Sequence, residues 1–137
     1  MENHFLIGTK NNGCFIDNNA HIIEYYERLN LPEKLSKKDP CTTIKYENIT
    51  KIQVTYAISE GIGFGVITLH LIIETQDLQK HNFQILFMDT QREDLNKFIK
   101  LLFEANLTII DEHDLLKTIL QSNEKIYEII EKIEKNR

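Results

Sequence analysis

Residues 43–87 read TIKYENITKIQVTYAISEGIGFGVITLHLIIETQDLQKHNFQILF, and the rest of the chain is organised around this segment. Apolar and polar residues alternate in three runs, which are separated by the glycine-rich residues 61–65 and by Gln76-Asp77. A period of two places the apolar side chains of each run on one face, so the runs predict a meander of half-buried antiparallel strands. The predicted strands and their apolar positions are residues 50–58 (Ile52, Val54, Tyr56, Ile58), residues 66–75 (Ile67, Leu69, Leu71, Ile73) and residues 80–88 (Phe83, Ile85, Phe87).

Four further short strands are predicted before this meander, at residues 5–9, 14–17, 21–27 and 43–46. Asn12-Gly13, between the first two, tolerates positive φ and predicts a tight type I′ hairpin turn. Residues 28–40 contain both prolines and much of the local charge, so we expect a surface loop or a short helical segment there. Seven short strands, most of them joined by short turns, favour a small barrel or an orthogonal sandwich.

The hydrophobic period changes after the meander. Thr90 and Glu93 have the spacing of a capping box, in which a hydroxyl and a carboxylate satisfy free N–H groups at a helix start. We therefore expect a helix over residues 91–104 that buries one apolar face against the open face of the sheet. Residues 106–110 predict a short extended linker. The apolar face of the helix consists of Leu95, Phe98, Ile99, Leu102 and Phe103.

The composition is typical of one soluble globular domain. The 137 residues are 42% hydrophobic and 27% charged, and the formal net charge is -5. This acidic balance argues against a broad nucleic-acid interface, which takes clustered lysines and arginines. The sequence shows no secretory signal and no membrane-spanning run. Cys14 and Cys41 are too few and too far apart for a zinc or redox motif, and they favour a cytoplasmic location.

The order of the predicted elements resembles the bacterial pleckstrin-homology-like (PH-like) domains. The resemblance covers roughly residues 5–104, and it rests on the Ile44-Lys45-Tyr46-Glu47-Asn48-Ile49 turn, which enters a strand at Ile52-Gln53-Val54, and on the helix at 91–104. It implies two near-orthogonal antiparallel sheets closed at one end by a helix, with residues 106–137 as an extension of a domain at 1–105. It also implies a binding scaffold. The eukaryotic members bind phosphoinositides through basic residues around the first hairpin turn, where this chain has the single lysine Lys10.

Motifs that resemble catalytic or cofactor sites lack the required context. Gly61-Ile62-Gly63-Phe64-Gly65 is rich in glycine like a phosphate-binding loop, but it precedes a β-branched strand instead of a helix, which favours a hairpin connection. Asp111-Glu112-His113-Asp114 offers potential metal ligands, yet consecutive helical residues point about 100° apart, so helix capping explains them better. His70 has no carboxylate or nucleophile in a recognisable motif. We therefore expect no metal, no cofactor and no enzymatic activity.

A weak basic cluster lies within residues 28–40. It consists of Lys34, Lys37 and Lys38, and Glu33 and Asp39 dilute its charge. A solvated loop is the simplest interpretation of such a cluster. The alternative is a contact with an anionic lipid or a nucleic acid.

A last helix is expected over residues 111–135, capped by Asp111 and roughly 36 Å long if unbroken. Its apolar positions step by three and four residues, which is the heptad spacing of a coiled-coil seam. Asn123 falls at an a position, where a buried asparagine fixes the register. Leu115, Leu120 and Ile129 widen the stripe, so packing of the helix on its own domain remains the alternative. The seam consists of Leu116, Ile119, Asn123, Ile126, Ile130 and Ile133.

These observations lead to the hypothesis of a non-enzymatic, cytoplasmic PH-like binding or scaffold protein. It would self-associate, most simply as a dimer, or dock a protein partner through its C-terminal helix. The alternative function is binding of a small ligand or an anionic membrane surface through the barrel rim and residues 34–38.

Overall fold

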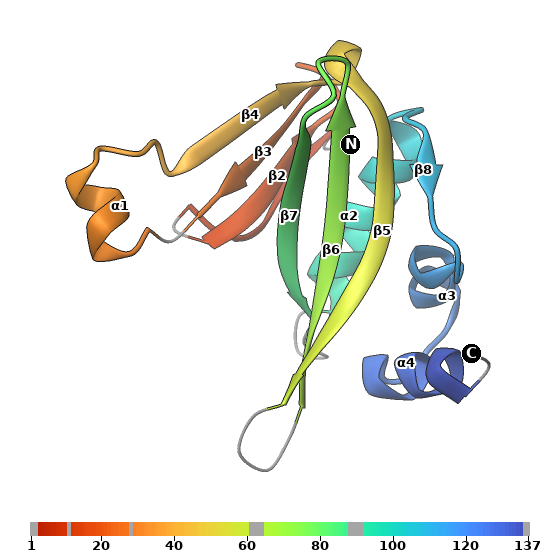
Figure 1. The fold of residues 1–137 in the computed structure, drawn as a ribbon. Helices are drawn as coiled ribbons and strands as arrows, with labels where there is room; N and C mark the ends of the chain where they lie inside the picture. Colours follow the sequence, from red (N-terminus) through yellow and green to blue (C-terminus); the bar gives the residue numbers. More distant parts are fainter. Residues whose placement is uncertain (1–2, 11, 28, 61–64, 88–91, 136–137) are drawn as a thin grey trace.

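The computed structural model describes residues 3–10, 12–27, 29–60, 65–87 and 92–135. Within these residues the chain is mainly β, as predicted, with two sheets and four α-helices (Figure 1). The elements are β1 (His4–Thr9), β2 (Asn12–Asp17), β3 (Ile22–Tyr26), α1 (Leu31–Leu35), β4 (Cys41–Lys45), the 3-10 turn η1 (Tyr46–Asn48), β5 (Ile49–Glu60), β6 (Gly65–Thr75), β7 (Lys80–Phe87), α2 (Arg92–Glu104), β8 (Ile109–Ile110), α3 (Leu115–Gln121) and α4 (Ile126–Lys135).

The strands form two separate four-stranded sheets. The first has the order β1-β2-β3-β4 and is antiparallel throughout. The second has the order β7-β6-β5-β8, in which the meander pairs antiparallel and the short β8 joins β5 in parallel. The described strands therefore make two sheets instead of one closed barrel. The eighth strand comes from the segment that was predicted as an extended linker, where Ile109 pairs with Ile52.

The prediction of a hairpin turn at Asn12-Gly13 is wrong. Asn12 pairs with Thr9 and Gly13 pairs with Gly8, so the predicted turn residues begin strand β2. Gly13 is needed for a different reason than a turn conformation. A Cβ atom on this residue would lie 2.5 Å from the carbonyl oxygen of Ile7, so only glycine permits this close approach of the two strands.

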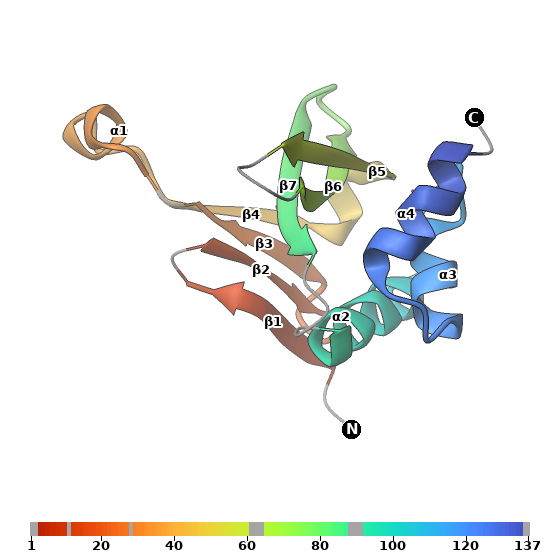
Figure 2. The same ribbon diagram turned by 90° about the horizontal axis from the view of Figure 1, so that it is seen from below.

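The core lies between the inner faces of the sheets and α2. The period-two prediction is confirmed for the central part of each meander strand, where buried residues alternate with less buried ones. Ile58, near the end of β5, is instead 48% exposed, and the side chain of Phe87 is not among those described. Tyr25 of β3 stacks on Phe83 of β7 at 4.8 Å between ring centroids, which connects the sheets. Figures 1 and 2 show α2 beside the second sheet and next to β1 and β2. The buried set is Ile7, Cys14, Ile16, Ile23 and Ile44 from the first sheet, and Ile52, Val54, Leu69, Leu71, Ile73, Phe83 and Ile85 from the second.

Helix α2 buries most of its predicted face. Four of the five predicted apolar residues are buried, but Phe103 is 41% exposed and Leu101 is buried in its place. The helix is therefore rotated toward the first sheet, where the Asn18 side chain donates to the Leu101 carbonyl at 3.0 Å. Tyr46 donates to the Asn18 side-chain oxygen at 2.6 Å and holds it in place. Thr90, half of the predicted capping box, lies outside the described residues.

The prediction of one unbroken helix over residues 111–135 is wrong. The chain forms α3 and α4, and Ser122 between them is extended at φ -108° and ψ 146°. The Ser122 hydroxyl accepts the Glu124 N–H at 3.0 Å, a local hydrogen bond that competes with continued helix. The N-cap residue of α3 is Asp114 rather than the predicted Asp111, but the Asp111 carboxylate accepts the N–H groups of Leu115 and Leu116 at 2.9 and 2.8 Å and so satisfies the start of this helix.

Candidate functional site

Helix α1 stands apart from the rest of the molecule. It lies at the end of the β3–β4 hairpin, and both views place it at the outer limit of the fold (Figures 1 and 2). The helix forms because Asn30 and Glu33 make a capping box: the Asn30 side chain accepts the Glu33 N–H at 2.9 Å, and the Glu33 carboxylate accepts the Asn30 N–H at 3.1 Å. Pro32 in the first turn further favours the helical start. The structure thus confirms the short helical alternative for residues 28–40.

The apolar side chains of α1 point to solvent. Leu31 is 67% exposed and Leu35 is 75% exposed, and α1 has no buried residue. Residues four positions apart lie on the same face of a helix, so the two leucines form one small apolar surface. Paired exposed leucines on a projecting element have no role in the core of this chain. Together with Lys34 and Lys37 they form the surface called here the α1 tip.

The lysines of the predicted basic cluster differ in whether they form ion pairs. Lys38 makes ion pairs with Glu33 at 3.0 Å and with Glu27 at 3.5 Å, and it ties the end of the helix to the hairpin. The hydrogen bond to Glu33, followed by the charges of Glu27 and Glu33, raises the Lys38 pKa. Lys34 and Lys37 are exposed and form no ion pair with any described residue. Their positive charges remain available beside the exposed leucines.

The residues of the predicted seam lie mostly in the core of their own chain. Leu116, Ile119, Ile126 and Ile130 are buried, and Ile133 is partly buried against the same core. Asn123 is exposed in the turn between α3 and α4, so it does not occupy a heptad position of a continuous helix. The packing on the chain's own domain, which the sequence left open, accounts for these residues. Self-association is not tested by this arrangement and stays a prediction.

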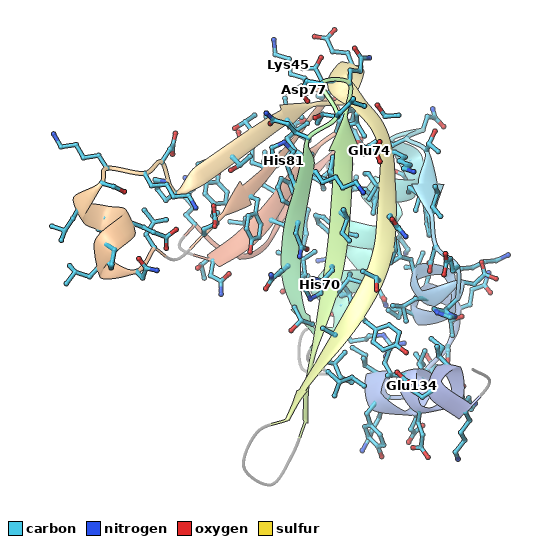
Figure 3. All side chains as sticks on the ribbon, in the orientation of Figure 1. Lys45, His70, Glu74, Asp77, His81 and Glu134 are labelled. Carbon is cyan, nitrogen blue, oxygen red and sulfur yellow. The ribbon has the colours of Figure 1, made fainter. Side chains whose placement is uncertain are left out.

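A polar cleft that the sequence did not indicate lies between the ends of the two sheets. Its volume is about 330 Å³. Figure 3 shows two of its lining residues, Asp77 and His81, at the end of β6 and the start of β7. The remaining lining residues come from β4, η1, the end of β6 and the β6–β7 turn. Because β4 is far from β6 in the sequence, no local pattern marks the cleft. They are Thr42, Thr43, Ile44, Asn48, Thr75 and Gln76.

The other predicted motifs have structural explanations or fall outside the described part. Residues 61–64 of the glycine-rich turn are not among the described residues. His70 is bonded to the Asn82 side chain at 3.1 Å, and His113 lies edge-on to Tyr56. In the described ranges, no three His, Cys, Asp or Glu side chains are grouped so as to hold a metal ion. Cys14 is fully buried, and burial raises its pKa, which makes the thiol unreactive.

No helix among the described residues is long and apolar enough to cross a membrane. Comparison with protein-family models, with curated proteins and with solved structures gave no match to this chain.

Proposed function

We propose that this chain is a non-enzymatic PH-like binding module that docks reversibly on anionic membrane surfaces through the α1 tip. The observation that carries the proposal is the exposure of Leu31 and Leu35 together on an element that lies beyond the end of β3 and β4 (Figure 1). An apolar pair flanked by lysines is complementary to a bilayer with anionic headgroups, because the acyl region accepts leucines and the surface potential attracts lysines. Two mainly antiparallel sheets with an associated helix also support the PH-like assignment.

The expected affinity is low. Each lysine near an anionic surface contributes about 1 kcal/mol, and complete burial of each leucine contributes at most about 1.5–3 kcal/mol. Two lysines and two leucines give a gross gain of about 5–8 kcal/mol, from which the cost of orienting the protein must be subtracted. The α1 tip therefore suits transient contact at the cytoplasmic face of a membrane, where anionic lipids are enriched.

Vesicle co-sedimentation tests this function. Vesicles of phosphatidylcholine and phosphatidylserine should bind the protein in a salt-sensitive manner, and pure phosphatidylcholine should bind it much more weakly. The double variants Leu31→Ser/Leu35→Ser and Lys34→Glu/Lys37→Glu should each reduce binding. The matched controls are Leu78→Ser, at a leucine that is 83% exposed in the β6–β7 turn, and Lys117→Glu, at an exposed lysine of α3. Equal loss in the controls would assign binding to general surface character.

A second candidate function is self-association or protein docking through the C-terminal helices. The observation that favours it is Tyr127, which is 53% exposed on α4, the last helix of the chain and an outer element in Figure 2. Exposed tyrosines are enriched where proteins meet. Light scattering at tens of micromolar protein should then give about twice the chain mass of 16.1 kDa, and Tyr127→Glu should return it to the single-chain value. A monomeric wild type would leave the α1 tip as the docking element.

A further inference from the structure

Strand β7 has an unpaired edge. Within the described residues it is the last strand of its sheet and pairs only with β6. The Thr75 N–H donates to the Gln79 carbonyl at 3.0 Å. This hydrogen bond shows which residues of β7 direct their backbone groups toward β6, because every second residue of an antiparallel strand does so. Because backbone groups of successive residues point to opposite sides, His81 bonds toward β6, whereas Lys80 and Asn82 direct their N–H and C=O groups away from the sheet.

The polar cleft described above lies beside this edge, and β4 forms its opposite wall. β4 is also the last strand of its sheet in the described part of the chain. The Glu27 N–H donates to the Pro40 carbonyl at 2.8 Å, and the same alternation then directs the backbone groups of Thr43 away from β3. Thr43 lines the cleft. Main-chain donors and acceptors are therefore available on both sides of a space of about 330 Å³.

The cleft also contains an acidic group. The Thr75 hydroxyl and the Gln79 N–H both donate to Asp77, and these bonds hold the pKa of its carboxyl below the usual value. No lysine or arginine among the described residues forms an ion pair with Asp77. The hydroxyls and amides that complete the lining are hydrogen-bonding groups, so the cleft is suited to a cationic side chain rather than an apolar one.

The available edge is short. The next residue of β7 whose backbone faces away from β6 is Gln84. Burial raises the pKa of the Tyr25 hydroxyl and a hydrogen bond with the Gln84 backbone lowers it in part, so the hydroxyl lies beside this residue. Tyr25 is held there by its stacking on Phe83. Tyr25 therefore limits the available part of the β7 edge at Gln84, and the β6–β7 turn limits it at the other end.

We propose that residues 80–82 of β7 take up a short extended peptide segment as an added strand, with a lysine or arginine of that segment in the cleft beside Asp77. Main-chain hydrogen bonds to Asn82 and Lys80 supply sequence-independent affinity, and the cleft selects the basic side chain. The occupant is a peptide segment of a partner protein. This site does not depend on the α1 tip, which lies on a different element.

The probe is a phage-displayed library of random linear peptides, panned on the whole immobilised protein. The enriched sequences should contain a lysine or arginine at a constant position. A resynthesised peptide should bind in fluorescence anisotropy, and Asp77→Asn should weaken it about tenfold or more, since hydrogen bonds to charged groups contribute about 1.5–3 kcal/mol. Peptides without a basic residue, or no enrichment above an Asp77→Asn protein, would overturn the proposal.

Two substitutions of Asn82 distinguish peptide binding through main-chain hydrogen bonds from binding through the Asn82 side chain. Asn82→Ala keeps the N–H and should bind the peptide within about threefold of the wild type, which is within the scatter of surface substitutions. Asn82→Pro removes an N–H that faces away from the sheet, so the protein should still fold and should lose peptide binding. Hydrogen exchange by NMR gives a second measurement on the unmodified protein: the Asn82 amide should exchange fast alone and slowly with peptide. An Asn82 amide already protected without peptide would contradict the open edge.

Discussion

The guanidinium group of Arg92, on the first turn of α2, donates to the carbonyl oxygen of Ile119 in α3 at 2.9 Å. The same group donates to the carbonyls of Ser122 at 2.8 Å and Glu124 at 2.7 Å. Carbonyls at the end of a helix have no partner within that helix, so Arg92 satisfies the groups that the break between α3 and α4 leaves open. This contact orders the turn between the last two helices.

Replacement of Arg92 should therefore destabilise the C-terminal helices. Arg92→Met keeps much of the side-chain stem but removes all three hydrogen bonds, and we expect a loss of about 2–4 kcal/mol in the free energy of unfolding. Urea denaturation measures this loss, and Lys100→Met on the exposed side of the same helix is the control. A loss below about 0.5 kcal/mol would mean that the turn orders without Arg92.

Phe98 tests the packing of α2 between the sheets. Its side chain is fully buried, so Phe98→Ala should cost about 3–5 kcal/mol by leaving a cavity. Phe103, on the same helix but exposed, is the matched control, and Phe103→Ala should cost less than about 1 kcal/mol. Thermal and urea unfolding check both values. Similar losses for the two variants would contradict the observed rotation of the helix.

Substitution of Ile130 distinguishes packing within one chain from an interface between two chains. It is buried in the core of its own chain, so Ile130→Asp places a carboxylate in an apolar site and should largely unfold the C-terminal helices, at a cost above about 3 kcal/mol. The unfolding should not depend on protein concentration. Circular dichroism over a dilution series measures this. A folded Ile130→Asp monomer formed from a wild-type dimer would instead support the seam predicted from the heptad spacing.

The α1 cap should depend on pH in the acid range. The Asn30 N–H and then the Lys38 ammonium lower the pKa of the Glu33 carboxyl. A lowered folded-state pKa means that the capping interaction is complete above the ordinary glutamate pKa and is lost as the pH falls through the lower folded value. An NMR titration of the Asn30 amide should show this midpoint, and Glu33→Gln should abolish it. A midpoint at or above the ordinary value would contradict the capping box.

The meander was predictable from the sequence because its signal is local. Alternation from Ile52 to Phe83 records which side chains face the core, and the structure retains it. The first turn was misplaced because Asn12-Gly13 has turn chemistry, whereas Gly13 is needed for its close approach to Ile7. The helix break was missed because apolar spacing continues across Ser122, while the contact from Arg92 is long-range.

The candidate sites were less predictable because they depend on how segments far apart in the sequence are arranged. The lysines of the α1 tip were visible as a basic cluster, but no sequence pattern indicated that Leu31 and Leu35 would be exposed. Leucines four residues apart usually indicate a buried face, and only the direction of the β3–β4 hairpin leaves them in solvent. The cleft at Asp77 is lined by residues of β4 and of the β6–β7 turn, so it depends on the relative positions of the two sheets.

The α1 tip should enter an anionic membrane surface, and an environment-sensitive fluorophore at residue 35 measures this entry. Cys14 is buried, so a Cys41→Ser background allows selective labelling of Leu35→Cys or, as the control, Leu78→Cys. With phosphatidylserine-containing vesicles, we expect a blue-shifted emission from the label at residue 35 that high salt reverses, and no shift from the label at residue 78. An unchanged emission at residue 35, or an equal shift at residue 78, would contradict membrane docking through the α1 tip.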